Sequence, residues 1–174
     1  MNKIAAVGNG GILLETELGK IIDRHKTVAR FNNYKIEEAY VKNTGVKTDI
    51  WVTTFYRDIR KPTLIPKKVV CPFPLNDKRW NKKYYRNISL IKETNPEFIP
   101  ALYFIELTKH IVNPSCGMAY LFWLYKTNLL KECDLYGFSF FQGKHHYFED
   151  KGGCLHNGAA EIKLYKKMLD GDMT

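Results

Sequence analysis

The chain has 174 residues, of which 45% are hydrophobic and 14% aromatic, a composition that suits one globular domain and excludes a disordered chain. Its formal net charge is +9, and its four cysteines show neither metal-type pairing nor the pattern of a disulfide framework. No apolar run approaches the roughly 20 residues of a membrane-spanning helix, and the first residues lack a signal-peptide core. We therefore expect a reducing, cytoplasmic setting.

The first 33 residues predict a strand, a glycine turn, a helix and a second strand. The strand Ile4–Val7 runs into the turn 8–11, and the strand Val28–Phe31 ends on Asn32 and Asn33. Between them, helical spacing predicts one buried stripe formed by Leu14, Leu18, Ile21, Ile22 and His25. Such a unit brings the turn and the end of the second strand to the sheet edge where α/β folds bind nucleotides.

The residues at this edge argue against a dinucleotide. The third glycine of a dinucleotide fingerprint would fall at Leu13, and no acidic residue ends the second strand. Asn9, Asn32 and Asn33 offer amide donors and acceptors instead, which suit a ribose, a base edge or one phosphate. A polar turn that binds no ligand remains an equal alternative.

The middle of the chain predicts two further strands, at Asp49–Phe55 and Lys68–Phe73, joined to the first unit by a polar connection over residues 36–49. From there to residue 100 we expect loops with one short helix. Between residues 56 and 92 the sequence has eleven Lys or Arg but only two Asp, and aromatic residues are interleaved with the basic ones. This composition suits binding to an anionic membrane, an acidic glycan or a nucleic acid. A solvated lysine-rich insertion that binds nothing would have the same composition.

The last third predicts three helices and a strand. Ala101–Ile111 has apolar residues at helical spacing, and Met118–Tyr125 reads as a helix buried all round. Asp134–Phe141 is expected to be a central strand. A closing helix follows Asn157, which is placed to cap it.

Histidines concentrate near the end of the chain. His146 follows the last predicted strand and His156 precedes the last helix, so both are expected at the rim that faces the asparagines. Histidine is suited to moving protons near neutral pH, and Glu161 is close enough along the helix to orient His156. A zinc site would need His145, His146, Cys154 and His156, whose spacing matches no finger pattern. Three surface histidines in a loop remain the alternative.

Four stretches, in this order, resemble the motifs of the sialyltransferases that use a CMP-linked sugar. Residues 7–49, from VGNGG to GVKTD, resemble the large motif, and residues 113–138, from NPSCG to CDLYGF, the small motif. The third motif is matched by HYFE at 146–149, and the last by His156 with Glu161. Animal members join a cysteine of the large motif to one of the small motif. Here Cys133 fits the second place, but residues 4–6 leave the first without a cysteine.

The resemblance implies a single α/β domain over residues 1–174, Rossmann-like, with a mostly parallel sheet and helices on both faces (a GT-A-like variant). The basic, proline-rich segment at about 56–100 would be an insertion. It further implies that the donor is bound by Asn9, Gly10, Asn32, Asn33, Ser115, Cys116 and Gly117. Cys116 departs from the usual Ser or Thr. His146 would bind the phosphate and help it leave, and His156 would be the general base. Tyr147, Glu149 and Glu161 would support them.

The implied reaction is an inverting transfer of sialic acid, or a similar 2-keto acid sugar such as Kdo, from a CMP donor to the hydroxyl of a glycan or glycolipid. Neither a metal nor a cofactor is expected. Arg79, Lys82 and Lys83 would give a peripheral contact with an anionic membrane at its inner face, and no nucleic acid is expected as a partner. The alternative is a nucleic-acid or anionic-surface binding protein that uses the basic segment on a degenerate transferase scaffold.

Overall fold

A computed structural model describes residues 3–56, 59–74, 87–143, 146–148 and 156–173. Six parallel strands form one sheet in the order β5-β4-β3-β2-β1-β6. The strands are β1 (Ile4–Val7), β2 (Thr27–Phe31), β3 (Ile50–Val52), β4 (Lys68–Cys71), β5 (Glu97–Phe98) and β6 (Cys133–Tyr136). This is the single Rossmann-like domain with a parallel sheet that the sequence predicts.

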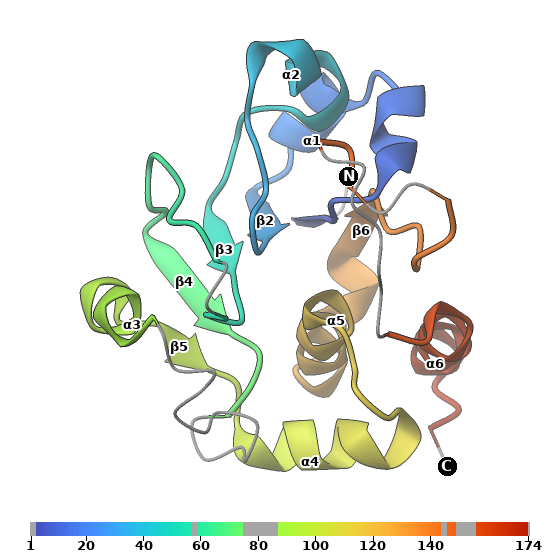
Figure 1. The fold of residues 1–174 in the computed structure, drawn as a ribbon. Helices are drawn as coiled ribbons and strands as arrows, with labels where there is room; N and C mark the ends of the chain where they lie inside the picture. The colour runs from blue at the N-terminus through green and yellow to red at the C-terminus, as the bar shows by residue number, and fades with distance from the viewer. Residues whose placement is uncertain (1–2, 57–58, 75–86, 144–145, 149–155, 174) are drawn as a thin grey trace.

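Helices cover both faces of the sheet (Figure 1). Helices α1 and α2 lie on one side, and α4, α5 and α6 lie on the other. The helices are α1 (Gly19–Asp23), α2 (Glu38–Thr44), α3 (Ile88–Thr94), α4 (Ala101–His110), α5 (Cys116–Lys126) and α6 (Gly158–Asp170), with the 3₁₀ turns η1 (Gly11–Glu15) and η3 (Leu130–Glu132). Within the described ranges, no helix combines the length and the apolar character needed to cross a bilayer.

The order of the strands reverses between β1 and β6. The chain adds β2 to β5 outward from β1, then passes through α4 and α5 and places β6 on the free side of β1. The helices that follow these two strands, α1 after β1 and α6 after β6, therefore lie on opposite sides of the sheet (Figure 1), an arrangement that opens a crevice at the carboxyl ends of the strands. The topology fixes the position of a ligand site before any side chain is considered.

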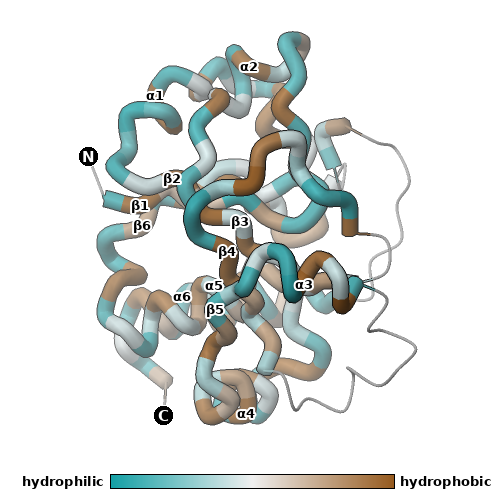
Figure 2. Tube along the Cα trace, turned by 90° about the vertical axis from the view of Figure 1, so that its left-hand side faces the viewer, coloured by the Kyte–Doolittle hydropathy of each residue, from teal (hydrophilic) through white to brown (hydrophobic). Residues whose placement is uncertain are grey.

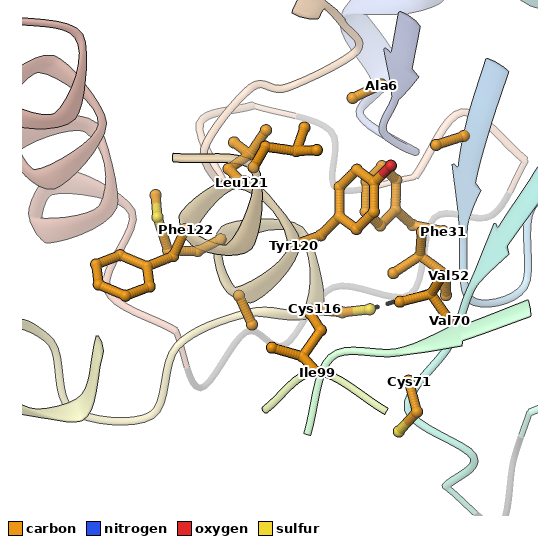
Figure 3. Close-up of a cluster of buried hydrophobic side chains, with 14 of the residues drawn as sticks. Ala6, Phe31, Val52, Val70, Cys71, Ile99, Cys116, Tyr120, Leu121 and Phe122 are labelled. Carbon is orange, nitrogen blue, oxygen red and sulfur yellow. Dashed lines mark hydrogen bonds between the residues drawn. The ribbon is translucent and has the colours of Figure 1, made fainter. Parts of the chain in front are cut away.

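The two sides of the sheet have separate cores. On β1, Ala5 and Val7 pack with α1, whereas Ala6 belongs to the larger cluster around α5. Figure 3 shows Phe31 and Tyr120 side by side in that larger cluster, where their rings meet edge to face with centroids 5.6 Å apart. Figure 2 shows the apolar character of the interior as brown colour along β4.

The uninterrupted apolar sequence of α5 is explained by its central place under the sheet. Its side chains from Met118 to Phe122 and that of Leu124 are buried, whereas Trp123 and Tyr125 are half-buried, so the predicted burial on all sides is confirmed except at these two residues. Ser115 caps this helix, because its hydroxyl accepts a hydrogen bond from the Met118 amide at 3.0 Å. Asn157 caps α6 in the same way through the Ala160 amide, at 3.1 Å, as predicted.

The prediction of a single helix between the first two strands is wrong. The chain forms η1 and α1 instead, with an extended break at Thr16. The side-chain amide of Asn43 donates to carbonyl groups of this break, and tight packing of Gly19 against α2 stops α1 from rotating to bury a regular stripe. A Cβ at Gly19 would lie 2.2 Å from the Val41 carbonyl oxygen. Accordingly Leu14 and Ile21 are not buried but 38% and 40% exposed.

Two further expectations about secondary structure are corrected. Part of the polar connection after β2 is helical, as α2, and its carboxyl end is stopped by Gly45 at φ 69°. The predicted central strand 134–141 is the edge strand β6, which ends at Tyr136. Gly137 follows at φ 66° and turns the chain out of the sheet.

Candidate active site

A pocket of about 280 Å³ lies at the carboxyl ends of β1, β2 and β6. Its walls are the turns after these strands, the first turn of α5 and the two histidine segments. Nine of the residues that the sequence singles out line it together: Asn9, Gly10, Asn32, Ser115, Cys116, Gly117, His146, His156 and Glu161. Asn9 and His156, which are 147 residues apart in the chain, thus share one crevice.

The glycine turn after β1 forms the floor of the pocket. The amides of Gly8 and Gly10 donate to the carbonyl oxygens of Tyr136 and Gly137 at 2.8 and 2.9 Å, which ties this turn to the loop after β6. A Cβ on Gly10 would lie 2.6 Å from the Gly137 oxygen. Glycine is therefore required here for close approach of two backbones.

Asn9 presents an unsatisfied acceptor. Its Nδ2 donates to the Phe31 carbonyl at 3.0 Å, which fixes the orientation of the amide. Its Oδ1 is buried and has no hydrogen-bond partner among the described residues. Because such an atom is costly to leave unpaired, it is suited to a donor group on a ligand, such as a hydroxyl or an amino group.

Asn32 complements Asn9 as a donor. It sits in the left-handed region at φ 47°, and its carbonyl oxygen accepts a hydrogen bond from the Trp51 indole at 2.9 Å. Its Oδ1 accepts from the Thr54 amide and hydroxyl at 3.2 and 3.3 Å, which turns Nδ2 away from these partners. Asn33, by contrast, lines a neighbouring hollow, where its Oδ1 accepts from the Arg60 amide at 2.7 Å.

The amino end of α5 is clamped by a buried carboxylate. Glu161 accepts hydrogen bonds from the amide and the hydroxyl of Ser115 at 2.7 and 2.9 Å. Burial outweighs these bonds and raises the pKa of Glu161 above its ordinary value. The clamp aligns the first amides of α5 with the pocket, an end of a helix that favours an anionic ligand group. The Cys116 thiol points elsewhere, toward the Val52 carbonyl at 3.8 Å (Figure 3).

His156 is oriented by a backbone carbonyl. Its Nδ1 lies 2.8 Å from the oxygen of Asn113, and since a carbonyl can only accept, Nδ1 carries the proton. In the neutral ring Nε2 is then the basic nitrogen. The ring of Phe141 lies against the imidazole, with centroids 5.3 Å apart.

His146 is held in the pocket wall by the residue that follows it. The Tyr147 amide donates to the Asn9 carbonyl at 2.9 Å, and its hydroxyl accepts from the Lys35 amide at 2.9 Å and donates to the Lys35 carbonyl. Burial raises the pKa of the Tyr147 hydroxyl to about 12. Tyr147 does not line the pocket; it anchors the segment whose first residue, His146, does.

Sequence reasoning missed the aromatic part of the pocket lining. Phe138, Phe140 and Phe141, together with Ser139, line the pocket after β6, in the stretch that was expected to be strand. Phe140 and Phe141 have φ values of 46° and 64°, which non-glycine residues rarely adopt. The only signal in the sequence was Gly137, which marks where the strand ends.

Some predicted residues lie outside the described part of the chain: Glu149, His145, Cys154, Arg79, Lys82 and Lys83. Among the residues that are described, no group of three or more His, Cys, Asp or Glu side chains could hold a metal ion.

A parallel α/β domain with a polar pocket at its switch point, backed by a helix amino terminus and histidines, is built like a nucleotide-dependent transferase. The family model for glycosyltransferase family 29 (sialyltransferase) matches residues 1–63. A human alpha-2,8-sialyltransferase 8E is 35% identical over 101 residues, which are 58% of this chain and 23% of that protein. A chicken CMP-N-acetylneuraminate-beta-galactosamide-alpha-2,3-sialyltransferase 1 is 29% identical over 93% of this chain and 54% of that protein.

The fold agrees with these matches. A crystal structure of a mammalian sialyltransferase in complex with Gal-beta-1-3GalNAc-ortho-nitrophenol superposes with a TM-score of 0.67 at 19% identity, covering 99% of this chain and 67% of that one. Residues 1–63 thus resemble the sialyltransferases of glycosyltransferase family 29, and the whole chain shares the fold of the mammalian sialyltransferase structure. It spans about half the length, or less, of the curated relatives that it matches. These similarities do not favour the alternative of a nucleic-acid or anionic-surface binding protein.

Proposed function

We propose that the chain transfers sialic acid, or a similar 2-keto acid sugar such as Kdo, from a CMP donor to a hydroxyl of an acceptor glycan. The observation that carries the proposal is that one pocket is lined by both Asn9, whose Oδ1 is a buried acceptor without a partner among the described residues, and His156. Asn9 and Asn32 supply an amide acceptor and an amide donor for the nucleoside. The amino end of α5 supplies N–H groups for a carboxylate or a phosphate.

In the proposed reaction the acceptor hydroxyl gives its proton to Nε2 of His156 as its oxygen attacks the anomeric carbon. The bond from that carbon to the phosphate oxygen breaks, and CMP leaves with the electron pair. His146 stabilises the charge that develops on the phosphate. Displacement from the opposite side inverts the anomeric centre. Because the donor carries a good leaving group, positioning, a base and a phosphate partner suffice, and no metal is required.

The test is release of CMP from CMP-sialic acid and from CMP-Kdo in the presence of a glycan panel, with and without EDTA. His156→Ala should lower turnover by about 10²–10⁴-fold while CMP affinity is retained. His110→Ala, which removes an exposed histidine on α4, is the matched control and should leave turnover unchanged. Full activity of His156→Ala, or a requirement for a divalent metal, would refute the mechanism.

We also infer a peripheral contact with the inner, cytoplasmic face of an anionic membrane, since the net charge of +9 is concentrated between residues 56 and 92. Reversing the charge at Arg79, Lys82 and Lys83 should abolish association with phosphatidylserine vesicles. Unchanged association would rule the contact out.

A further inference from the structure

The loop that leaves β6 has a strained backbone directly beside His156. Phe140 and Phe141 follow each other in this loop, with φ values of 46° and 64°. Bulky residues rarely adopt this left-handed region, because the β-carbon comes too close to the following carbonyl oxygen. Two such residues in succession persist only where the surrounding structure holds them, and strain of this kind gathers at functional sites. The contacts of these two residues therefore show what the strained loop positions.

Helix α6 holds the loop in this form. A Cβ on Gly158, the first residue of the helix, would lie 1.8 Å from the Phe140 carbonyl oxygen and 3.5 Å from the Phe141 ring. Tyr165, about two turns further along α6, packs against the Phe140 ring with centroids 5.9 Å apart. Since only a glycine permits so close an approach, the backbone of α6 itself braces the left-handed pair.

The bracing fixes the position of one aromatic ring. The Phe141 ring lies against the imidazole of His156, with centroids 5.3 Å apart and 33° between the two planes. Both side chains line the pocket. The Asn113 carbonyl oxygen lies 2.8 Å from Nδ1 of the same imidazole. The imidazole is thus held by a hydrogen bond at one nitrogen and by an aromatic ring against its plane, which leaves Nε2 for the reaction.

An aromatic ring acts differently on the two protonation states of an imidazole. The face of a phenyl ring carries partial negative charge, and a cation within about 6 Å of its centroid is attracted to it. The distance of 5.3 Å between Phe141 and His156 falls within this range. A charged His156 ring is therefore stabilised by Phe141 more than a neutral one.

Other titratable groups share the pocket with His156. Three of them, among the residues that the structure describes, are Cys116, His146 and Glu161. Glu161 interacts electrostatically with His156 from α6, and Cys116 is buried. None of the three changes when Phe141 is replaced. A change in the protonation of His156 on replacing Phe141 therefore reports the effect of the aromatic ring.

We propose that Phe141 is a positioning residue that acts through His156, by orienting the imidazole and by stabilising the imidazolium that forms during the transfer. In that step the O–H bond of the acceptor hydroxyl breaks as its oxygen bonds to the anomeric carbon. The proton stays on Nε2, and CMP leaves with the electron pair of the bond to the phosphate oxygen. This role rests on the proposed function, whereas the effect of the ring on protonation of His156 can be measured without turnover.

The first measurement is the titration of His156 in the full chain, followed by NMR through the Hε1 signal that is absent from His156→Ala. Phe141→Leu keeps an apolar side chain but removes the aromatic face, so the midpoint of the titration should move to lower pH by roughly 0.4–1.5 units. Phe141→Tyr keeps the face and should keep the midpoint. Phe98→Leu, the same change at a half-buried residue of β5 on the far edge of the sheet, is the matched control and should also keep it.

The second measurement is turnover of CMP-sialic acid as a function of pH. Phe141→Leu should lower kcat by roughly 2- to 30-fold and move the acidic limb of the kcat profile to lower pH, in step with the titration. The KM for the donor should change little. Gly158→Ala displaces the loop instead of removing the ring and should have the same effects. Because both changes act through one contact, their effects should not add in the double variant.

An unchanged midpoint in Phe141→Leu, or an equal shift in Phe98→Leu, would overturn the proposal whether or not turnover is seen. An equal shift in Phe141→Tyr would also overturn it, since the shape of the side chain and not the aromatic face would then be responsible. If the midpoint moves as expected but no CMP-linked sugar is turned over, the proposed transfer fails while the action of Phe141 on His156 stands.

Discussion

Removal of the Tyr147 hydroxyl isolates the anchor that holds His146 beside the glycine turn. In Tyr147→Phe the ring stays buried against Tyr40, but the amide and the carbonyl of Lys35 lose their partners. Two neutral hydrogen bonds at about 0.5–1.5 kcal/mol each predict a loss of roughly 1–3 kcal/mol in the free energy of unfolding. Urea unfolding followed by tryptophan fluorescence measures this loss. Tyr125→Phe, on the partly exposed side of α5, should change it by less than about 0.5 kcal/mol.

The same residue predicts a pH dependence. Burial raises the pKa of Tyr147 to about 12 from an ordinary 10. The group is an acid whose folded-state pKa lies above its unfolded value, so its contribution is complete below pH 10 and is lost as the pH rises toward 12. At pH 11, one unit above the unfolded pKa, the contribution of this group to the free energy of unfolding has fallen by roughly 1.4 kcal/mol. The stability advantage of the wild type over Tyr147→Phe should shrink by this amount between pH 8 and 11.

The effect on binding should be indirect. Because Tyr147 supports His146 without lining the pocket, Tyr147→Phe should raise the KM for the donor more than it lowers kcat. A variant as stable as the wild type at pH 8, or a stability difference that does not change up to pH 11, would refute this reading of the anchor.

Three further substitutions test the site and the sheet. Gly10→Ala places a methyl group 2.6 Å from the carbonyl oxygen of Gly137; the turn must shift, and CMP binding measured by calorimetry should be lost. Glu161→Ala removes the acceptor of two buried hydrogen bonds to a carboxylate, which should cost about 3–6 kcal/mol in urea unfolding; a loss below about 1 kcal/mol would contradict the clamp. Ile4→Cys faces Cys133 across β1 and β6, so oxidation should form a bridge, visible as loss of free thiols, that adds up to about 5 kcal/mol to the free energy of unfolding.

The spacing of apolar residues predicted helices and strands well where burial alone determined the local sequence. Burial on both faces produces the short apolar runs of β1 and β2, and burial on most sides produces the apolar run of α5. The helix after β1 was mispredicted because the close approach of Gly19 to α2, a tertiary contact, overrides the apolar spacing. The exit of β6 was mispredicted because Phe138 and Phe140 continue an apolar run that reads as strand.

In the candidate site, too, the sequence predicted the polar residues but not the contacts that the fold creates between distant residues. The asparagines and histidines were visible in the sequence because polar groups that follow apolar strands are conspicuous. The role of the Asn113 carbonyl in orienting His156 could not be predicted, since it joins residues 43 positions apart. The role of buried Arg30 was equally hidden, because it reads in the sequence as a strand residue while its guanidinium donates to the carbonyl oxygen of Thr44, 14 positions away.

Thermal unfolding in the presence of CMP, UDP, GDP or NAD tests the central claim most directly. If the pocket between β1 and β6 is a CMP site, CMP at 100 times its Kd should stabilise the chain by about 2.7 kcal/mol, with a clear rise in Tm. Asn9→Ala should lose this rise, and UDP, GDP and NAD should give little or none. Equal protection by all four nucleotides, or by NAD and not by CMP, would contradict the account.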